Sequence, residues 1–170
     1  SKGKNHILLF KAIHKLASKN KPLNLLICGN GKLEKHLKTL AKKLKIKNLV
    51  YFLGFTDKRI DVMHHSDIKI LTSKKEAFGI VLAEAALLKK PLIGTKGTGM
   101  ENVIKHKNTG LLFENESYLD LAKKIEQLID NPKLQKEYGL NAYNYVKNNF
   151  TSDVLIKKLE KFYTKLQGSI

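Results

Sequence analysis

With 170 residues, of which 42% are hydrophobic, the chain can bury one ordinary core, and no segment resembles a linker between two cores. The single cysteine, Cys28, excludes an intramolecular disulfide and a cysteine-based metal cluster, and no apolar run reaches the roughly 18 residues that a membrane span needs. The net charge of +17 comes from 32 basic residues of which only Arg59 is an arginine, so nucleic-acid binding, which relies on bidentate arginine contacts, is not expected.

Short apolar runs and amphipathic patterns alternate along the first two thirds of the chain. Apolar runs bounded by turn residues predict strands, and apolar positions at helical spacing, separated by lysines, predict amphipathic helices. In chain order, these patterns predict a strand at Leu23–Cys28, a helix containing Leu33, Leu37, Leu40, Ala41 and Leu44, a strand at Leu49–Leu53, a helix at Arg59–His65, a strand at Ile68–Leu71, a helix at Gly79–Lys89, a strand at Leu92–Gly94, a helix at Met100–Lys105 and a strand at Gly110–Phe113.

Helices dominate the sequence after Glu116. They are predicted at Tyr118–Asp130 with a cap near Ser117, from Pro132 or Lys133 to Asn148, and from Ser152 or Asp153 to Leu166. Alternating strands and helices are typical of a parallel sheet covered on both faces. We therefore expect a Rossmann-like α/β domain with a helical C-terminal tail. Its ligands should bind at the carboxyl ends of the strands, and Cys28 at one such end should be a small buried residue.

Glu84 lies in the middle of an apolar helix. It is surrounded by the sequence Phe78 to Leu88, and no lysine or arginine lies within one helical turn of it. Glutamate is rarely buried unless it is paired, because removing a charge from water is costly. We expect a distant basic residue or the hydroxyl groups of a bound ligand to meet its carboxylate. The preceding segment, Thr72–Gly79, connects a strand to the helix N-terminus, which is a geometry that binds anions.

The stretch from Glu76 to Ala85 resembles the E-x7-E motif of glycosyltransferase family 4, whose members are retaining enzymes with the two-domain B-type glycosyltransferase fold. Further segments follow in the family's order and spacing: Leu26–Gly31, Val50–Phe55, Pro91–Thr95, Gly97–Glu101 and Asn108–Phe113. The resemblance runs from about Ser1 to Phe113, with a family-like helical tail after it. It covers only the C-terminal, donor-binding half of such an enzyme, so residues 1–170 are expected to form a single nucleotide-sugar-binding domain.

The resemblance implies roles for individual residues. Glu84 would hold the ribose of the nucleotide, and Glu76, the candidate catalytic residue, would lie near the hydroxyl groups of the donor sugar. Backbone N–H groups of the segment that begins the helix would contact the sugar and pyrophosphate, and Lys4 would contact the phosphates. The expected substrate-binding residues are Lys4, Gly29, Gly31, Gly54, Phe55, Thr56, Ser73, Phe78, Gly79, Ile80, Val81 and Glu84.

The sequence also departs from the family. The family's first donor-domain strand ends in Gly-Arg just before the position of Ser1, so we expect that a central strand and a phosphate-binding arginine are missing and that the chain is a fragment. The acceptor-binding domain would be its partner, and the fragment alone would be inactive. No metal is expected, because the histidines show no convincing ligand spacing, and no cofactor is expected beyond the nucleotide-diphosphate sugar, which is the substrate.

The resemblance implies transfer of a hexose from a nucleotide-diphosphate sugar to a glycan or lipid-linked acceptor, with retention at the anomeric carbon. The N-terminal residues Ser1–His6 lack the apolar core of a signal peptide, so a cytoplasmic protein is expected, with weak attraction of its lysines to an anionic membrane face left open. Two alternatives also stay open. One is an epimerase- or phosphorylase-like enzyme on the same fold, and the other is a non-catalytic binding or interaction module.

Overall fold

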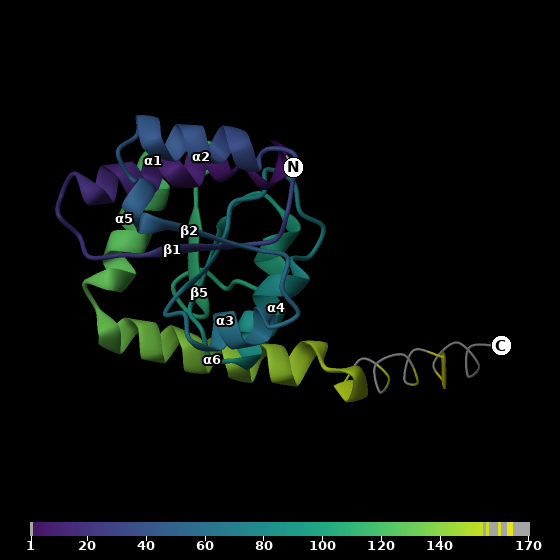
Figure 1. Ribbon diagram of the computed structural model, residues 1–170. Coiled ribbons are helices and arrows are strands. Elements are labelled where there is room, and N and C mark those ends of the chain that lie inside the picture. Colours follow the sequence, from purple (N-terminus) through teal and green to yellow (C-terminus); the bar gives the residue numbers. More distant parts are fainter. Residues whose placement is uncertain (1, 155, 157–159, 161–162, 165–170) are drawn as a thin grey trace.

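The computed structural model describes residues 2–154, 156, 160, 163 and 164 (Figure 1). The strands are β1 (Leu25–Cys28), β2 (Val50–Gly54), β3 (Lys69–Leu71), β4 (Leu92–Thr95) and β5 (Gly110–Phe113). The α-helices are α1 (His6–Ala17), α2 (Glu34–Lys43), α3 (Arg59–His64), α4 (Ile80–Leu87), α5 (Tyr118–Ile129) and α6 (Pro132–Phe150). Short 3-10 helices are η1 (Lys2–Lys4), η2 (Lys47–Leu49) and η3 (Gly99–Asn102).

All strand pairings in the described part of the chain are parallel. β1 pairs with β2, and β3, β4 and β5 form a second sheet in that order. The two sheets are not hydrogen-bonded to each other, so β1 and β3 each keep an unpaired edge among the described residues. A cavity of about 1160 Å³ is lined by both of these strands.

Helices cover both faces of the sheets, as the alternating pattern predicts. Side chains of α1, α2 and α5 form one core cluster with β1, β2 and part of β4 and β5, and side chains of α3, α4 and α6 form the other. Neighbouring strand residues divide between the clusters, since Ile93 belongs to the first and Leu92 to the second. In Figure 1, α1 and α2 lie side by side at one end of the domain and α6 lies at the opposite end.

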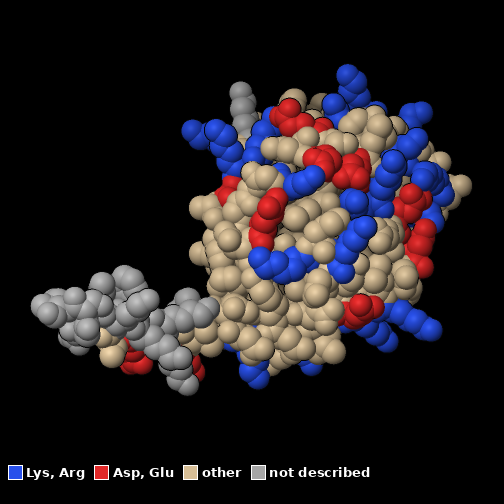
Figure 2. Space-filling view, turned by 180° about the vertical axis from the view of Figure 1, so that it is seen from behind, with Lys and Arg blue, Asp and Glu red and all other residues tan. Residues whose placement is uncertain are grey.

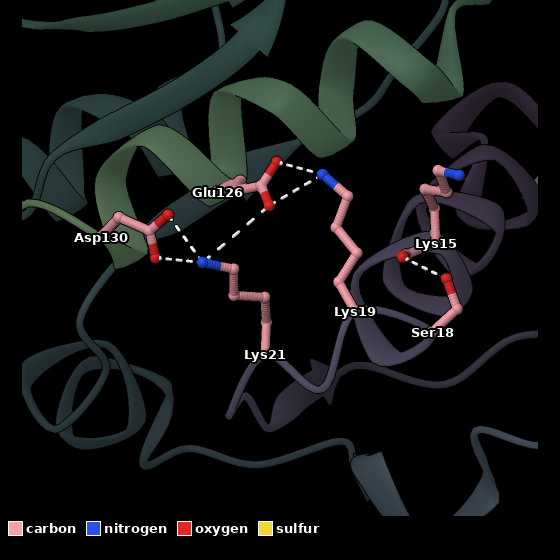
Figure 3. A network of polar contacts seen from close by, with 6 residues as sticks. All are labelled: Lys15, Ser18, Lys19, Lys21, Glu126 and Asp130. Atoms are coloured by element: carbon pink, nitrogen blue, oxygen red, sulfur yellow. Dashed lines mark hydrogen bonds and ion pairs between the residues drawn. The ribbon is translucent and has the colours of Figure 1, made fainter.

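Two lysines in the connection between α1 and β1 form ion pairs with acidic residues on and directly after helix α5 (Figure 3). The ammonium group of Lys19 contacts Glu126 at 2.8 Å, and that of Lys21 contacts Asp130 at 2.7 Å. The hydrogen bond that Lys21 donates to the Asp130 carboxylate raises the pKa of Lys21. These pairs join segments more than 100 residues apart in sequence, and they help to fix where β1 starts.

The structure differs from the sequence predictions at several places. The sequence patterns do not include helix α1, although Leu9, Ile13 and Leu16 recur at helical spacing and are buried. Cys28, expected to be buried, is exposed at the end of β1. The predicted helix over Ser152–Leu166 lies partly outside the described residues. No helix in the described part of the chain is both long and apolar enough to cross a membrane.

The predicted helix at Met100–Lys105 is instead the four-residue 3-10 helix η3. The hydroxyl group of Thr109 explains this difference, because it accepts the backbone N–H of Lys105 at 2.8 Å and donates to the carbonyl oxygen of Val103 at 3.1 Å. Both backbone groups are thereby bonded to a side chain and not to a continuing helical ladder.

Helix α4 is shorter than predicted at both ends. Gly79 precedes it as the N-cap, with a φ of 84° in the left-handed region that favours glycine. At the other end, Lys89 has a φ of 55°, and the backbone N–H of Lys90 donates to the carbonyl oxygen of Ala85 at 3.0 Å. This is the hydrogen-bonding pattern of a helix that ends in a left-handed residue.

Candidate functional site

The segment Thr72–Gly79, which contains Glu76 of the E-x7-E motif, connects β3 to α4 at the carboxyl end of the sheet. It starts with two buried residues, Thr72 and Ser73, at 4% and 1% exposure. Gly79 has no side chain to cap the helix, so the N–H groups of the first turn are left without a side-chain acceptor. The helix dipole adds a partial positive charge at this end. The segment can therefore accept an anion at the start of α4, where the exposed Ile80 side chain points away from the core.

The Phe78 side chain is part of the core. Its ring contacts Phe150 in an edge-on arrangement, with ring centroids 5.0 Å apart, and Phe150 in turn contacts Tyr145. These contacts join the E-x7-E segment to helix α6. The role expected for Phe78, which uses its backbone N–H, is compatible with this packing because the ring is occupied elsewhere.

Helix α3 supplies a partner for Glu84. Two nitrogens of the Arg59 guanidinium group contact the two carboxylate oxygens, each at 2.9 Å. The sequence leaves open whether a distant basic residue or the hydroxyl groups of a ligand meet the Glu84 carboxylate. Arg59 is such a distant basic residue. The Glu84 side chain is also less buried than expected, with 23% of its surface exposed.

Glu76 and Lys4, which are 72 residues apart in sequence, lie side by side. The Lys4 ammonium group donates to a Glu76 carboxylate oxygen at 3.0 Å. The start of the chain is held against the end of β3 by two hydrogen bonds: the Thr72 hydroxyl donates to the carbonyl oxygen of Lys4 at 2.8 Å, and the Lys74 N–H donates to that of Gly3 at 3.0 Å. The fold thus brings the predicted phosphate lysine to the predicted sugar-binding glutamate.

The loop after β4 is hydrogen-bonded to the E-x7-E segment. The N–H of Gly99 donates to the carbonyl oxygen of Glu76 at 2.7 Å, and a Cβ atom on Gly99 would lie 1.8 Å from the carbonyl oxygen of Ala77. A second hydrogen bond, from Gly97 N–H to the Glu101 carboxylate at 2.6 Å, closes the loop. The sequence places Gly99 in the segment Gly97–Glu101, which resembles the family and follows a predicted strand, so it lies among the candidate residues Thr95–Glu101 at the carboxyl ends of the strands. Its close contact with Ala77 is not predicted by the sequence.

The loops after β1 and β2 form the other part of the carboxyl-end surface. Gly29 and Gly54 both have positive φ, and the Gly29 N–H donates to the carbonyl oxygen of Gly54 at 2.6 Å. The Thr56 hydroxyl accepts the N–H of Lys58 at 3.1 Å, while the Phe55 side chain is 82% exposed. The hydrogen bond between the two glycines couples the predicted Gly-x-Gly loop to the predicted nucleobase loop.

The large cavity unites only some of the predicted residues. Its lining includes Lys4, Gly29, Gly31 and Val81, but neither Glu76 nor Glu84. The lining also includes residues of the two facing strands β1 and β3. The side chains around the E-x7-E segment therefore define the candidate site.

The pKa values of two basic side chains near the site are lowered. Burial lowers the pKa of the Lys69 ammonium group on β3, and the Glu84 carboxylate opposes this shift. Burial also lowers the pKa of His6, and the positive charge of Lys4 acts in the same direction. Among the described residues, no group of three histidine, cysteine, aspartate or glutamate side chains could hold a metal ion.

Comparison with known proteins identifies the family. The pattern of the family described as Glycosyl transferases group 1 matches residues 1–145, and the chain belongs to this family. It is similar to N-acetyl-alpha-D-glucosaminyl L-malate synthase of Bacillus anthracis, with 34% identity over 82% of this chain and 36% of that protein. The chain therefore spans about a third of the length of this curated relative.

Solved structures support the fold. The structure of Anabaena Alr3699/HepE in complex with UDP and glucose superimposes with a TM-score of 0.86 at 23% identity, over 97% of this chain and 46% of that chain. The C-terminal domain of LpcC from Francisella tularensis, a glycosyl transferase group 1 family protein, superimposes with a TM-score of 0.79 at 24% identity. That match covers 89% of this chain and 82% of the Francisella domain. At these identities the two likenesses concern the fold.

Proposed function

We propose that this chain is a single domain that binds the nucleotide-diphosphate sugar donor of a retaining glycosyltransferase. The observation that carries the proposal is the arrangement around α4: an uncapped helix N-terminus with Glu76 and Lys4 on one side and Glu84 one turn into the helix. The fold likeness to a structure that contains UDP and glucose supports a donor of this class.

Each part of the arrangement suits one part of the donor. The first-turn N–H groups of α4 and the Lys4 ammonium group are suited to the pyrophosphate, because a helix N-terminus and a cation both stabilise negative charge. The Glu84 carboxylate can accept hydrogen bonds from the vicinal hydroxyl groups of a ribose, and Glu76 can accept them from the sugar. When the bond between sugar and pyrophosphate breaks, charge grows on the leaving diphosphate, where these donors are already in place.

Transfer would require a second domain that binds the acceptor and closes over the donor. A glycan or a lipid-linked molecule is the acceptor class we propose, with the protein in the cytoplasm and its basic residues at an anionic membrane face. Basic side chains near such a surface contribute about 1 kcal/mol each. On the face shown in Figure 2, lysines are interspersed with acidic residues and are not gathered into one patch. On this face the attraction would therefore be diffuse.

The test is a calorimetric titration of the chain with UDP-, GDP- and ADP-sugars, comparing wild type with Glu84→Gln. The substitution should weaken binding by about 1–3 kcal/mol, the range for charged hydrogen bonds. Because the Arg59–Glu84 pair is partly exposed, the loss of stability should stay below about 1 kcal/mol. The matched control is Glu126→Gln, which breaks an ion pair on α5. A chain that bound none of these sugars would be better described as an interaction module.

A further inference from the structure

Arg59 differs from every other basic residue of the chain. It is the only arginine, and the other ion pairs among the described residues are made by lysines. A guanidinium group is planar and presents two parallel N–H groups, whereas an ammonium group is a point charge that does not fix a carboxylate plane. The two contacts of 2.9 Å between Arg59 and Glu84 use this fork, with one nitrogen for each oxygen.

The pair leaves the Glu84 carboxylate able to bind more. An ionised carboxylate has about four lone-pair positions, and the guanidinium fork occupies one on each oxygen. The Glu84 side chain retains 23% of its surface, so the other positions can be reached from solvent. A free glutamate side chain would lose rotamer freedom on binding a ligand, whereas one already held by an arginine has lost it before the ligand arrives.

Arg59 also stands at a particular place in the fold. It is the first residue of α3, three positions after Thr56 of the Gly54–Thr56 loop. That loop is joined to the start of α3 by the hydrogen bond from Lys58 N–H to the Thr56 hydroxyl. The same arginine therefore connects the segment predicted to hold the nucleobase with the carboxylate predicted to hold the ribose, which are attached to each other in a nucleotide.

We propose that Arg59 is a positioning residue that orients the Glu84 carboxylate for the 2′- and 3′-hydroxyl groups, and so makes the site selective for ribonucleotides. This inference rests on the proposed function, because it requires that Glu84 meets the ribose. Nearby Lys69 does not replace the arginine, because a single ammonium group cannot engage both oxygens in one plane.

The test compares UDP, GDP and ADP with their 2′,3′-dideoxy counterparts by calorimetry on the 170-residue chain. The variants are Arg59→Ala, Arg59→Lys, Glu84→Gln and the double variant Arg59→Ala/Glu84→Gln. The control is Lys58→Ala, the neighbouring cation. We expect Arg59→Ala to weaken ribonucleotide binding about five- to tenfold, in the range of one ordinary net hydrogen bond, and dideoxynucleotide binding less than twofold. Arg59→Lys should recover part of this selectivity, Lys58→Ala should retain all of it, and the double variant should match Glu84→Gln alone.

Three results would overturn the inference while leaving the proposed function intact: tighter binding by Arg59→Ala, an equal loss for both ligand classes, or additive losses in the double variant. Additivity would mean that the two residues act independently. If Glu84→Gln kept full selectivity, or if wild type bound none of the three ribonucleotides, the proposed function would fail and the role of Arg59 with it. If Arg59→Ala does not fold, as judged by circular dichroism, the selectivity of Arg59→Lys between ribonucleotides and dideoxynucleotides tests the inference. This variant keeps the positive charge but loses the two parallel N–H groups of the guanidinium.

Discussion

Replacing Gly99 by alanine tests whether the loop after β4 sets the position of the E-x7-E segment. The backbone of Gly99 is outside the left-handed region, so alanine is not strained by its own backbone. The added Cβ would instead lie 1.8 Å from the carbonyl oxygen of Ala77 and 2.7 Å from that of Glu76. Even close contacts between carbon and a carbonyl oxygen are about 3.3 Å, so the two backbones must separate by about 1.5 Å.

The expected loss of stability follows from two contributions. Overpacking against atoms that cannot rotate away costs about 1–3 kcal/mol. Separating the segments also breaks the 2.7 Å hydrogen bond from Gly99 N–H to Glu76, which is worth about 1 kcal/mol. The sum is about 2–4 kcal/mol, which a domain of this size shows as a fall in Tm of about 4–16 °C. Because Glu76 and Ala77 move, donor binding should be lost as well.

The assay is chemical denaturation combined with titration of a UDP-sugar, and the control is Gly97→Ala in the same loop. At Gly97 a Cβ meets nothing within 4 Å, but φ is +74°, so only backbone strain of about 1 kcal/mol is expected. A Gly99→Ala protein as stable as Gly97→Ala, with unchanged affinity, would refute the reasoning, since it would show that the loop and the E-x7-E segment separate without cost.

Three further outcomes are expected. Gly79→Ala should lose about 1–2 kcal/mol of stability, because φ is +84° and Leu82 lies 3.1 Å from the new Cβ, and it should weaken UDP binding; unchanged affinity in calorimetry would remove the helix-terminus site. A chain extended upstream by about ten residues, enough for one apolar strand, should melt higher, associate less in light scattering and bind donor more tightly, because the strand would pair the free edges of β1 and β3; a monomeric short form of equal stability would contradict this. Because burial lowers the pKa of His6 in the native state, stability should be full above its unfolded pKa of 6.5 and decline as pH falls toward the lowered native value; His6→Gln should flatten this decline in melts between pH 7.5 and 5, whereas His14→Gln at an exposed position should not.

The order of the strands and helices, and the start of the candidate site, can be predicted from the amino-acid sequence alone. Strand runs such as Leu92–Gly94 are short and apolar, and the glycines at positions 29, 54 and 79 mark turns that need positive φ. These features depend on residues that are close in sequence. The spacing of Glu76 and Glu84 is local in the same sense, because both lie within one loop and the helix that follows it. Residues 6–17 also carried a local pattern, so α1 was predictable in principle.

The contacts between residues far apart in sequence depend on the packing of the elements and are seen only in the folded chain. Arg59 reaches Glu84 across 25 positions, Lys4 reaches Glu76 across 72, and Thr109 takes the backbone bonds that would have extended η3. Nothing in the periodicity of a segment specifies such partners, because periodicity shows which face of an element is buried and not what packs against it. The close approach of Gly99 to Ala77 likewise depends on how β3 and β4 pair. Glu84, isolated in its own helix, therefore acquires its cation only once α3 packs on α4.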